Sequence, residues 1–441
     1  MKPLPRRILD QLFQGNLPPQ AMALLGIRIA AVGLEFLCYL VLARVFRASA
    51  YGVYAIVMSC VAIFAVPAAC GLDRLLVREI AVLQARSDWS HAKGLLQRSQ
   101  QLVLGVSVAI AALGALGFTR IIGVSNASLV ESFRIGMVLI PLIAFARLRQ
   151  AALQGFGRVV AGQIPEALVQ PAIVILLAGM MFLVRPEPRG PQLAMTIQVI
   201  ASGAACLLGI FLLRRSIPPQ LESAAPRYHT GAWSTAGLHF MWIVGMTTVL
   251  TNSDTILLGL MTNPEQAGSY RVASQLAMFV GLPLTAVSVA MAPGMASMYT
   301  TGRIDELRVH CRAAARLIAL AAAGIASAVA IAGPEVLRLF GPEFGQGFNS
   351  ALVLSAAYLF HSAMATSGYL LIMSGHERLV ASIFSVGALT NVAGVAILVP
   401  TYGLVGAATA TGISLGLVSV TCALFARRLT GINATIFSAT P

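Results

Sequence analysis

Long apolar runs recur along the whole chain of 441 residues and constrain its fold more than any other feature. A helix that crosses the hydrocarbon core of a bilayer needs ~20 mostly apolar residues. Helix is the expected conformation there, because an open strand would leave its backbone polar groups unpaired in lipid. Runs of sufficient length lie at about 21–46, 51–72, 95–119, 128–153, 161–184, 192–213, 236–261, 267–299, 309–332, 347–373, 378–399 and 403–426. We therefore predict an all-α, polytopic membrane protein with about twelve transmembrane helices.

The composition supports this class. Hydrophobic residues make up 58% of the chain and charged residues only 10%, whereas soluble domains carry roughly 25% charged residues. A short polar arm precedes the first apolar run. That run is too long for the core of a cleaved signal peptide, so we expect it to be retained as a helix.

The excess of basic residues gives a formal net charge of +14. It indicates how the chain is oriented in the membrane rather than a nucleic-acid partner. The basic residues stand between the apolar runs and are concentrated in alternate connections. The positive-inside rule then places both termini in the cytoplasm. On this assignment Arg147, Arg149 and Arg158 belong to the connection after the fourth run. The predicted location is the cell (inner) membrane, with a multi-pass topology.

The two halves of the chain resemble each other. Residues 51–54 (Tyr-Gly-Val-Tyr) open the second run, and residues 267–270 (Ala-Gly-Ser-Tyr) open the eighth run 216 residues later. Pro67 and Pro283 follow at the same offset. Transporters built from such repeats bind substrate at the repeat interface. The predicted domains are an N-terminal lobe at 1–216 and a C-terminal lobe at 217–441, with a linker at 214–235.

The first run contains ionisable side chains at bilayer depth. Arg28 and Glu35 are seven residues apart, so both project from one helix face, and Tyr39 continues that stripe. At 1.5 Å per residue the two charged groups lie ~10 Å apart along the axis, too far for a simple direct pair. They could form interhelical salt bridges that fix packing. We favour an aqueous vestibule, because the two charges share a face.

The seventh run carries a broad polar face. It begins at Thr247 and Thr248 and continues to Asn252 and Asp254. Serine and threonine alone would be typical of helix packing, but asparagine and aspartate in the same patch favour a cavity lining. Arg271 in the eighth run falls at a depth similar to that of Asp254. We expect the two to be near neighbours, and such a pair could act as a gate.

Other chemistry is sparse. Glu166 is a weaker candidate, because helix capping or a nearby loop arginine would explain its position near the cytoplasmic end of the fifth span. The six cysteines form no CxxC pair and the histidines share no ligand spacing, so neither a metal site nor a cofactor is predicted. The sequence lacks GxxxxGK[ST], which excludes an ATPase motor of that type in this chain.

Several motifs together resemble the polysaccharide transporter, or Wzx-like oligosaccharide flippase, branch of the multidrug/oligosaccharidyl-lipid/polysaccharide exporter superfamily. The resemblance runs over most of the chain, and the order and spacing of the motifs carry it. The residues concerned are 50–55 (AYGVYA), 71–80 (GLDRLLVREI), 151–158 (AALQGFGR), 252–259 (NSDTILLG), 265–273 (EQAGSYRVA) and 292–293 (AP).

The resemblance implies two six-helix lobes in a V, alternating access, and an anionic lipid-pyrophosphate-linked oligosaccharide as cargo in O-antigen or exopolysaccharide biosynthesis. Arg28 would contact phosphate, because guanidinium matches its geometry. Glu35 or Asp254 would carry a coupling proton. The implied partners are lipid-linked oligosaccharide and membrane lipid, with a polysaccharide polymerase and glycosyltransferases as further partners.

Three other functions compete with flipping. An ion-coupled small-molecule or drug antiporter of the same superfamily should favour acidic over basic cavity residues, so Arg28 argues against it. A membrane enzyme such as a polymerase usually needs a long outer loop with catalytic residues, and no connection here exceeds roughly twenty-odd residues. A non-transporting scaffold would have little use for intramembrane charges. We therefore expect a transporter rather than an enzyme.

Overall fold

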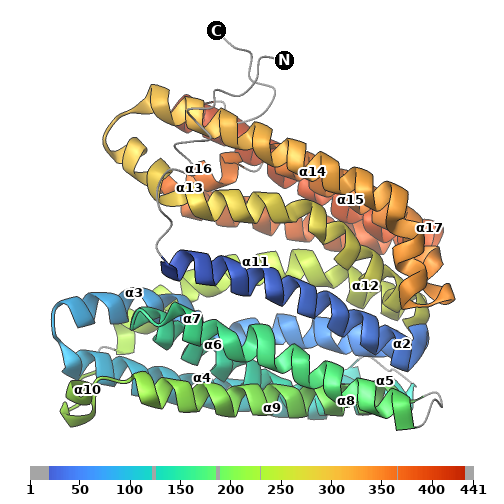
Figure 1. The fold of residues 1–441 in the computed structure, drawn as a ribbon, viewed down its shortest axis with the longest axis horizontal. Coiled ribbons are helices and arrows are strands. Elements are labelled where there is room, and N and C mark those ends of the chain that lie inside the picture. Colours follow the sequence, from blue (N-terminus) through green and yellow to red (C-terminus); the bar gives the residue numbers. More distant parts are fainter. Residues whose placement is uncertain (1–18, 122–125, 185–188, 229, 365, 433–441) are drawn as a thin grey trace. The chain divides into compact units, whose positions relative to one another are not determined.

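The computed structural model describes residues 19–121, 126–184, 189–228, 230–364 and 366–432, and within these ranges the chain contains helices and no strand. Figure 1 shows the helices and their labels. The predicted polar N-terminal arm lies outside the described residues. Two compact units account for the chain, Met1–Thr248 and Val249–Pro441, and each is considered by itself.

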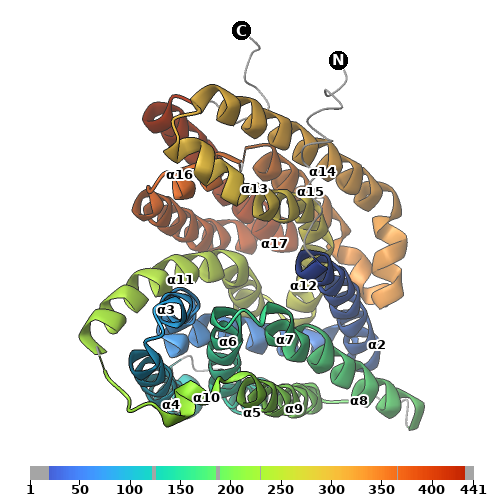
Figure 2. The same ribbon diagram turned by 60° about the vertical axis from the view of Figure 1, so that its left-hand side comes forward.

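The first unit follows the first six predicted spans. The 51-residue helix α2 covers two of them, because it bends at Arg47, where φ is 58°. Helix α6 packs against both α4 and α9, and α8 packs against α9, as Figures 1 and 2 show. Its elements are α2 (Pro19–Ala69), α3 (Leu72–Ala85), α4 (Trp89–Ile121), α5 (Ala127–Met137), α6 (Leu139–Gly155), α7 (Val159–Ile164), the π-helix η1 (Pro165–Val169), α8 (Gln170–Val184), α9 (Pro191–Ser216) and α10 (Pro219–Ser223).

The second unit follows the last six predicted spans. Its 54-residue helix α17 bends at Gly403, where φ is 53°, and so covers the last two. Helix α15 packs against both α14 and α17. The elements are α11 (Thr230–Met261), which begins in the first unit, α12 (Pro264–Met278), the 3₁₀ turn η2 (Phe279–Gly281), α13 (Leu282–Thr300), α14 (Ile304–Phe340), the 3₁₀ turn η3 (Pro342–Gly347), α15 (Phe348–Met364), α16 (Thr366–Met373) and α17 (Glu377–Thr430).

The structure confirms a polytopic, all-α membrane protein. Eight described helices are long and apolar enough to cross a membrane, or up to nine if one bent pair, Pro342–Met364 with Thr366–Met373, forms one span. The long helices α2 and α17 each count once in that total although each covers two predicted segments. Every predicted segment lies mainly on helix. The prediction of about twelve spans is consistent with this arrangement.

The two units divide inside α11 rather than at the 214–235 linker. A close backbone approach explains why the first half of α11 belongs with the first unit. A Cβ atom at Gly71 would lie 2.0 Å from the carbonyl oxygen of Gly237 on α11, and Gly71 itself has a φ of +64°. Only glycine satisfies both conditions. The assignment of the domains to 1–216 and 217–441 stays a prediction.

The linker after α9 is held against the first three turns of α4. Lys93 Nζ donates to the carbonyl oxygens of Glu222 at 2.6 Å and of Ala224 at 2.9 Å. The Tyr228 hydroxyl donates to Gln97 Oε1 at 3.0 Å. Gly94 provides the space, because a Cβ atom there would lie 1.8 Å from the carbonyl oxygen of Arg227. This linker segment is therefore part of the first unit and not a free tether.

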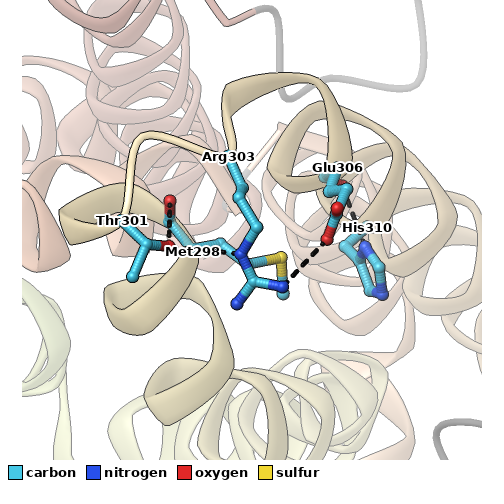
Figure 3. Close-up of polar contacts among 5 residues, drawn as sticks. All are labelled: Met298, Thr301, Arg303, Glu306 and His310. Carbon is cyan, nitrogen blue, oxygen red and sulfur yellow. Dashed lines mark hydrogen bonds and ion pairs between the residues drawn. The ribbon is translucent and has the colours of Figure 1, made fainter.

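A local hydrogen-bond network closes the turn between α13 and α14, as Figure 3 shows. Arg303 donates from Nε to Thr301 Oγ1 at 3.2 Å and from Nη1 to Glu306 Oε2 at 3.2 Å. His310 Nδ1 lies 2.8 Å from the carbonyl oxygen of Glu306. Acidic side chains in the first turn of α14 also favour its positive N-terminal end. These contacts are local and fix the start of α14.

Candidate functional site

A buried polar cluster in the second unit is centred on Asp254 of α11. Asp254 is 3% exposed and Tyr270 of α12 is fully buried. The Tyr270 hydroxyl donates to Asp254 Oδ2 at 2.7 Å, and Thr411 Oγ1 of α17 lies 3.3 Å from the same oxygen. The consecutive helices α11 and α12 and the distant helix α17 thus converge on one carboxylate.

Asn391 extends this cluster across α17. Its Nδ2 donates to the carbonyl oxygen of Leu250 at 2.9 Å and lies 3.4 Å from Ser253 Oγ. Thr411 Oγ1 is also 3.2 Å from Asn391 Oδ1. Apolar side chains, among them Leu258, surround Tyr270. The cluster is therefore a polar island within a hydrophobic core.

The chemistry of this island suits a small positive charge. An ionised carboxylate that is buried in an apolar core is costly unless other groups donate hydrogen bonds to it. Tyr270 and Thr411 supply such donors. The hydroxyls can also turn to accept, so the same oxygens could surround a protonated Asp254 or a small cation, which prefers oxygen ligands. Within the part of the chain that the structure describes, no group of three or more His, Cys, Asp or Glu side chains forms a metal site.

The predicted stripe on α2 is present on the first unit. Arg28 and Glu35 are exposed and Tyr39 is half-buried. The Tyr39 hydroxyl donates to Glu35 Oε1 at 2.7 Å. This bond links two predicted residues one helical turn apart and orients the carboxylate. The stripe therefore presents a cation and a hydrogen-bonded anion on one face of an otherwise apolar helix.

The remaining predicted residues lie on α11 and α12. Asn252 is 9% exposed, and its Nδ2 donates to Thr251 Oγ1 at 3.1 Å. Arg271 is half-buried and lies within electrostatic range of Asp254. The hydroxyls of Thr247 and Thr248 donate to the carbonyl oxygen of Val244 on their own helix, each at 2.8 Å. The first part of the predicted polar face is thus bonded along α11.

Arg149 requires a correction. The charge pattern predicts Arg149 in the connection after the fourth span, but Arg149 is 2% exposed on α6 and donates from Nη2 to Glu166 Oε1. Glu166 thus has an arginine partner from inside a span, not from a loop. The usable signal was its position within the predicted segment 128–153, because a charge inside an apolar run is a functional candidate. Tyr270, Asn391 and Thr411 were also missed.

Comparison with known families and relatives supports transport. A family model described as "Polysaccharide biosynthesis protein" matches residues 20–299, and one described as MatE matches residues 241–375. The "Probable flippase AglR" of Haloferax volcanii is 26% identical over 229 residues, 51% of this chain and 46% of that relative. The aligned region thus spans about half the length of the curated relative. These relatives point to transport rather than catalysis.

Solved structures share the fold at low sequence identity. An inward-facing multidrug resistance MATE family transporter of the MOP superfamily has a TM-score of 0.78 at 13% identity, covering 92% of this chain and 98% of that one. The lipid II flippase MurJ in an inward closed conformation has a TM-score of 0.69 at 14% identity, covering 92% and 87%. Because the first family model matches more than half of the chain, this multi-pass membrane protein belongs to the polysaccharide biosynthesis protein family, and its fold is similar to those of the MATE transporter and the MurJ flippase.

Proposed function

We propose that the protein flips a lipid-linked, pyrophosphate-type oligosaccharide across the inner membrane by alternating access, in O-antigen or exopolysaccharide biosynthesis. One observation carries the proposal: α2 exposes Arg28 and the hydrogen-bonded pair Glu35–Tyr39 on one face. Charges at hydrocarbon depth are costly unless they face water or a polar partner. A guanidinium on such a face can form bidentate hydrogen bonds to phosphate.

In this proposal Arg28 binds the pyrophosphate and the Glu35–Tyr39 pair orients the sugar-proximal end by hydrogen bonds. The family membership and the flippase name of the Haloferax relative support this class of cargo. In this proposal glycosyltransferases act before the flipping step and a polysaccharide polymerase acts after it. Both termini lie in the cytoplasm, as the alternation of basic connections predicts.

Asp254 is the coupling residue in the proposed cycle. Its carboxylate is buried on α11 and hydrogen-bonded by Tyr270, and the hydroxyls around it can turn to accommodate a bound proton or a small cation. Arg271, within electrostatic range of Asp254, disfavours a second positive charge there and favours release. Reversing both charges together should restore activity that either single reversal removes.

The test is flipping of a fluorescent lipid-pyrophosphate oligosaccharide in proteoliposomes. Arg28→Gln should lower the flipping rate at least about tenfold, which corresponds to ~1.4 kcal/mol of lost binding to the transport intermediate. Arg44→Gln is the matched control, because Arg44 is exposed on the opposite face of α2. Unchanged flipping by Arg28→Gln would remove the phosphate assignment. Asp254→Asn should abolish the response to an imposed ion gradient.

A MATE-like, ion-coupled small-molecule or drug antiporter is the alternative, and the MatE match at residues 241–375 favours it. The same vesicles distinguish the two functions. Gradient-driven extrusion of organic cations, with no movement of the lipid-linked sugar, would establish the antiporter and refute flipping. Under that outcome Arg28→Gln should raise cation transport, because it removes a repulsive charge.

A further inference from the structure

A second polar centre lies in the first unit, around the Arg149–Glu166 pair. Arg149 comes from α6 and its side chain is 1% exposed, whereas the Glu166 side chain on η1 is 25% exposed. Nη2 of Arg149 donates to Glu166 Oε1. Glu166 lies seven residues after the start of α7, or ~10 Å along the helix axis. It is therefore near the first end of its span. The guanidinium is thus fully buried, whereas part of the Glu166 side chain, although not its Oε2 atom, reaches the molecular surface.

The helix opposite the pair is shaped to receive the guanidinium. A Cβ atom at Gly209 of α9 would lie 1.9 Å from Arg149 Cζ and 2.0 Å from its Nη1. No other residue type leaves room for the arginine at this point. The packing of α6 against α9 at Gly209 therefore fixes the position of Arg149.

The pair is incompletely hydrogen-bonded. Nε and Nη1 of Arg149 and Oε2 of Glu166 are buried atoms without a hydrogen-bond partner. An unsatisfied buried polar group costs about 1–3 kcal/mol, and more when it is charged. Glu166 also lies in a π-helical turn, Pro165–Val169, and such turns interrupt α-helices frequently at functional sites. This arrangement is costly as a purely structural brace.

Few ionisable groups surround the pair. Arg149 is the charged group that acts on Glu166, and the thiol of Cys206 on α9 lies within electrostatic range of both. Helices α7 and α8 contain no ionisable side chain. On α2, which also packs against η1, no charged group acts on Glu166. A change of charge at Glu166 is thus felt first by Arg149.

We infer that Glu166 is a proton-binding site of the first unit, separate from Asp254, and that its protonation opens the ion pair with Arg149. A hydronium ion gives its proton to the Glu166 carboxylate, which becomes a neutral carboxylic acid, and a water molecule is left. The guanidinium stays charged and loses its anionic partner. Because an unpaired buried charge is strongly unfavourable, the site must admit water or another anion. Proton uptake is thereby converted into opening between η1 and α9.

The experiment uses Cys206 as a reporter and needs no cargo. In a full-length variant that keeps Cys206 as its single cysteine, alkylation by a membrane-permeant maleimide is measured in liposomes between about pH 5 and pH 8. Each rate is divided by the rate for the same variant unfolded in detergent at the same pH, which cancels the titration of the thiol itself. The normalised rate should rise severalfold on acidification, because Cys206, 6% exposed, becomes accessible.

Glu166→Gln should show the fast rate at every pH, whereas Glu166→Asp should retain the rise. A variant that keeps only Cys422, which is buried on α17 of the second unit, is the control and should show no rise. A flat profile in the Cys206 parent, or an unchanged profile in Glu166→Gln, overturns the inference. If Glu166→Gln fails to fold, infrared difference spectra decide, since the carboxylic acid band formed on acidification must shift in Glu166→Asp. Neither result depends on flipping.

Discussion

The two units bury an equivalent tyrosine but surround it with different chemistry. Tyr54 and Tyr270 are 216 residues apart, both are buried, and each donates a hydrogen bond within its own unit. Tyr54 donates to the neutral amide oxygen of Gln198 at 3.2 Å, whereas Tyr270 donates to the carboxylate of Asp254 at 2.7 Å. The shorter bond to a charged acceptor is the stronger type. Tyrosines at matching positions of the two sequence halves thus take part in two different polar centres.

The two units also differ in the groups that surround the acidic side chain. The first unit places Glu166 beside a fixed cation, Arg149, and leaves part of the Glu166 side chain exposed. The second unit places Asp254 among the neutral donors Tyr270 and Thr411 and buries it. Removing a partner should therefore have different consequences in the two units: loss of a cation strands a charge, whereas loss of a hydroxyl removes one of several donors.

The largest effect should come from breaking the ion pair on one side only. Arg149→Met leaves the Glu166 carboxylate without its cation and should lower the free energy of unfolding by about 3 kcal/mol, the lower end for a buried pair because Glu166 is partly exposed. Adding Glu166→Gln should restore most of that loss. Thermal unfolding in detergent measures both variants. Equal destabilisation in the single and double variants would show that packing, not charge, is lost.

The tyrosine comparison should give the next largest effect. Tyr270→Phe removes a hydrogen bond to a charged group and should cost about 2 kcal/mol, whereas Tyr54→Phe removes a neutral one and should cost about 1 kcal/mol. Both substitutions keep the ring and its packing. The same unfolding assay compares them directly. A larger loss for Tyr54→Phe would contradict the assigned difference between the units.

A smaller effect is expected from filling the space beside Arg149. Gly209→Ala introduces a methyl group that overlaps the guanidinium and should cost roughly 1–2 kcal/mol of unfolding free energy. Gly203→Ala on the same helix has no atom within 4 Å of the added Cβ, and should be neutral or stabilising by up to ~1 kcal/mol. If both variants unfold at the same temperature, Arg149 is not confined by α9.

The smallest effect concerns pH at the start of α4. The side chain and backbone N–H of His91 hydrogen-bond to Asp88 and hold the pKa of that carboxyl below its usual value of 3.8. A carboxyl with a depressed folded pKa stabilises the protein above its unfolded pKa, and the contribution disappears as the pH falls through the folded value. The melting temperatures of the parent and Asp88→Asn should therefore differ near neutral pH and converge below about pH 3. Asp305→Asn, at a 94% exposed side chain, should show a smaller difference.

Hydrophobicity was sufficient to predict the spans, because their length and apolar character are imposed by the bilayer. It could not predict that α2 would continue through a bend at Arg47, since a helix break of this kind depends on packing. The amphipathic helix α3 was also missed, because 14 residues are too few for a span. Its buried positions, Leu72, Leu75, Leu76 and Ile80, nevertheless follow helical spacing.

The candidate sites were predicted only where a charge stood inside an apolar run. Asp254 satisfied that condition, whereas Asn391 and Thr411 did not, because single polar residues in spans are usually helix contacts. These side chains meet across positions up to 157 residues apart. A single sequence, considered alone, does not reveal which distant positions come together. Arg149 was assigned to a connection because it lies near the end of its span, where boundaries are least certain.

The docking of the linker on α4 has a consequence for biosynthesis. Lys93 reaches the carbonyl oxygens of Glu222 and Ala224, and these residues leave the ribosome after the sixth span, which ends with α9 at Ser216. The surface of α4 around Lys93 therefore stays uncovered during synthesis until the chain has grown past the linker. A nascent protein that stalls at its sixth span has all the hydrophobic segments of its first half but lacks the linker segment that covers α4.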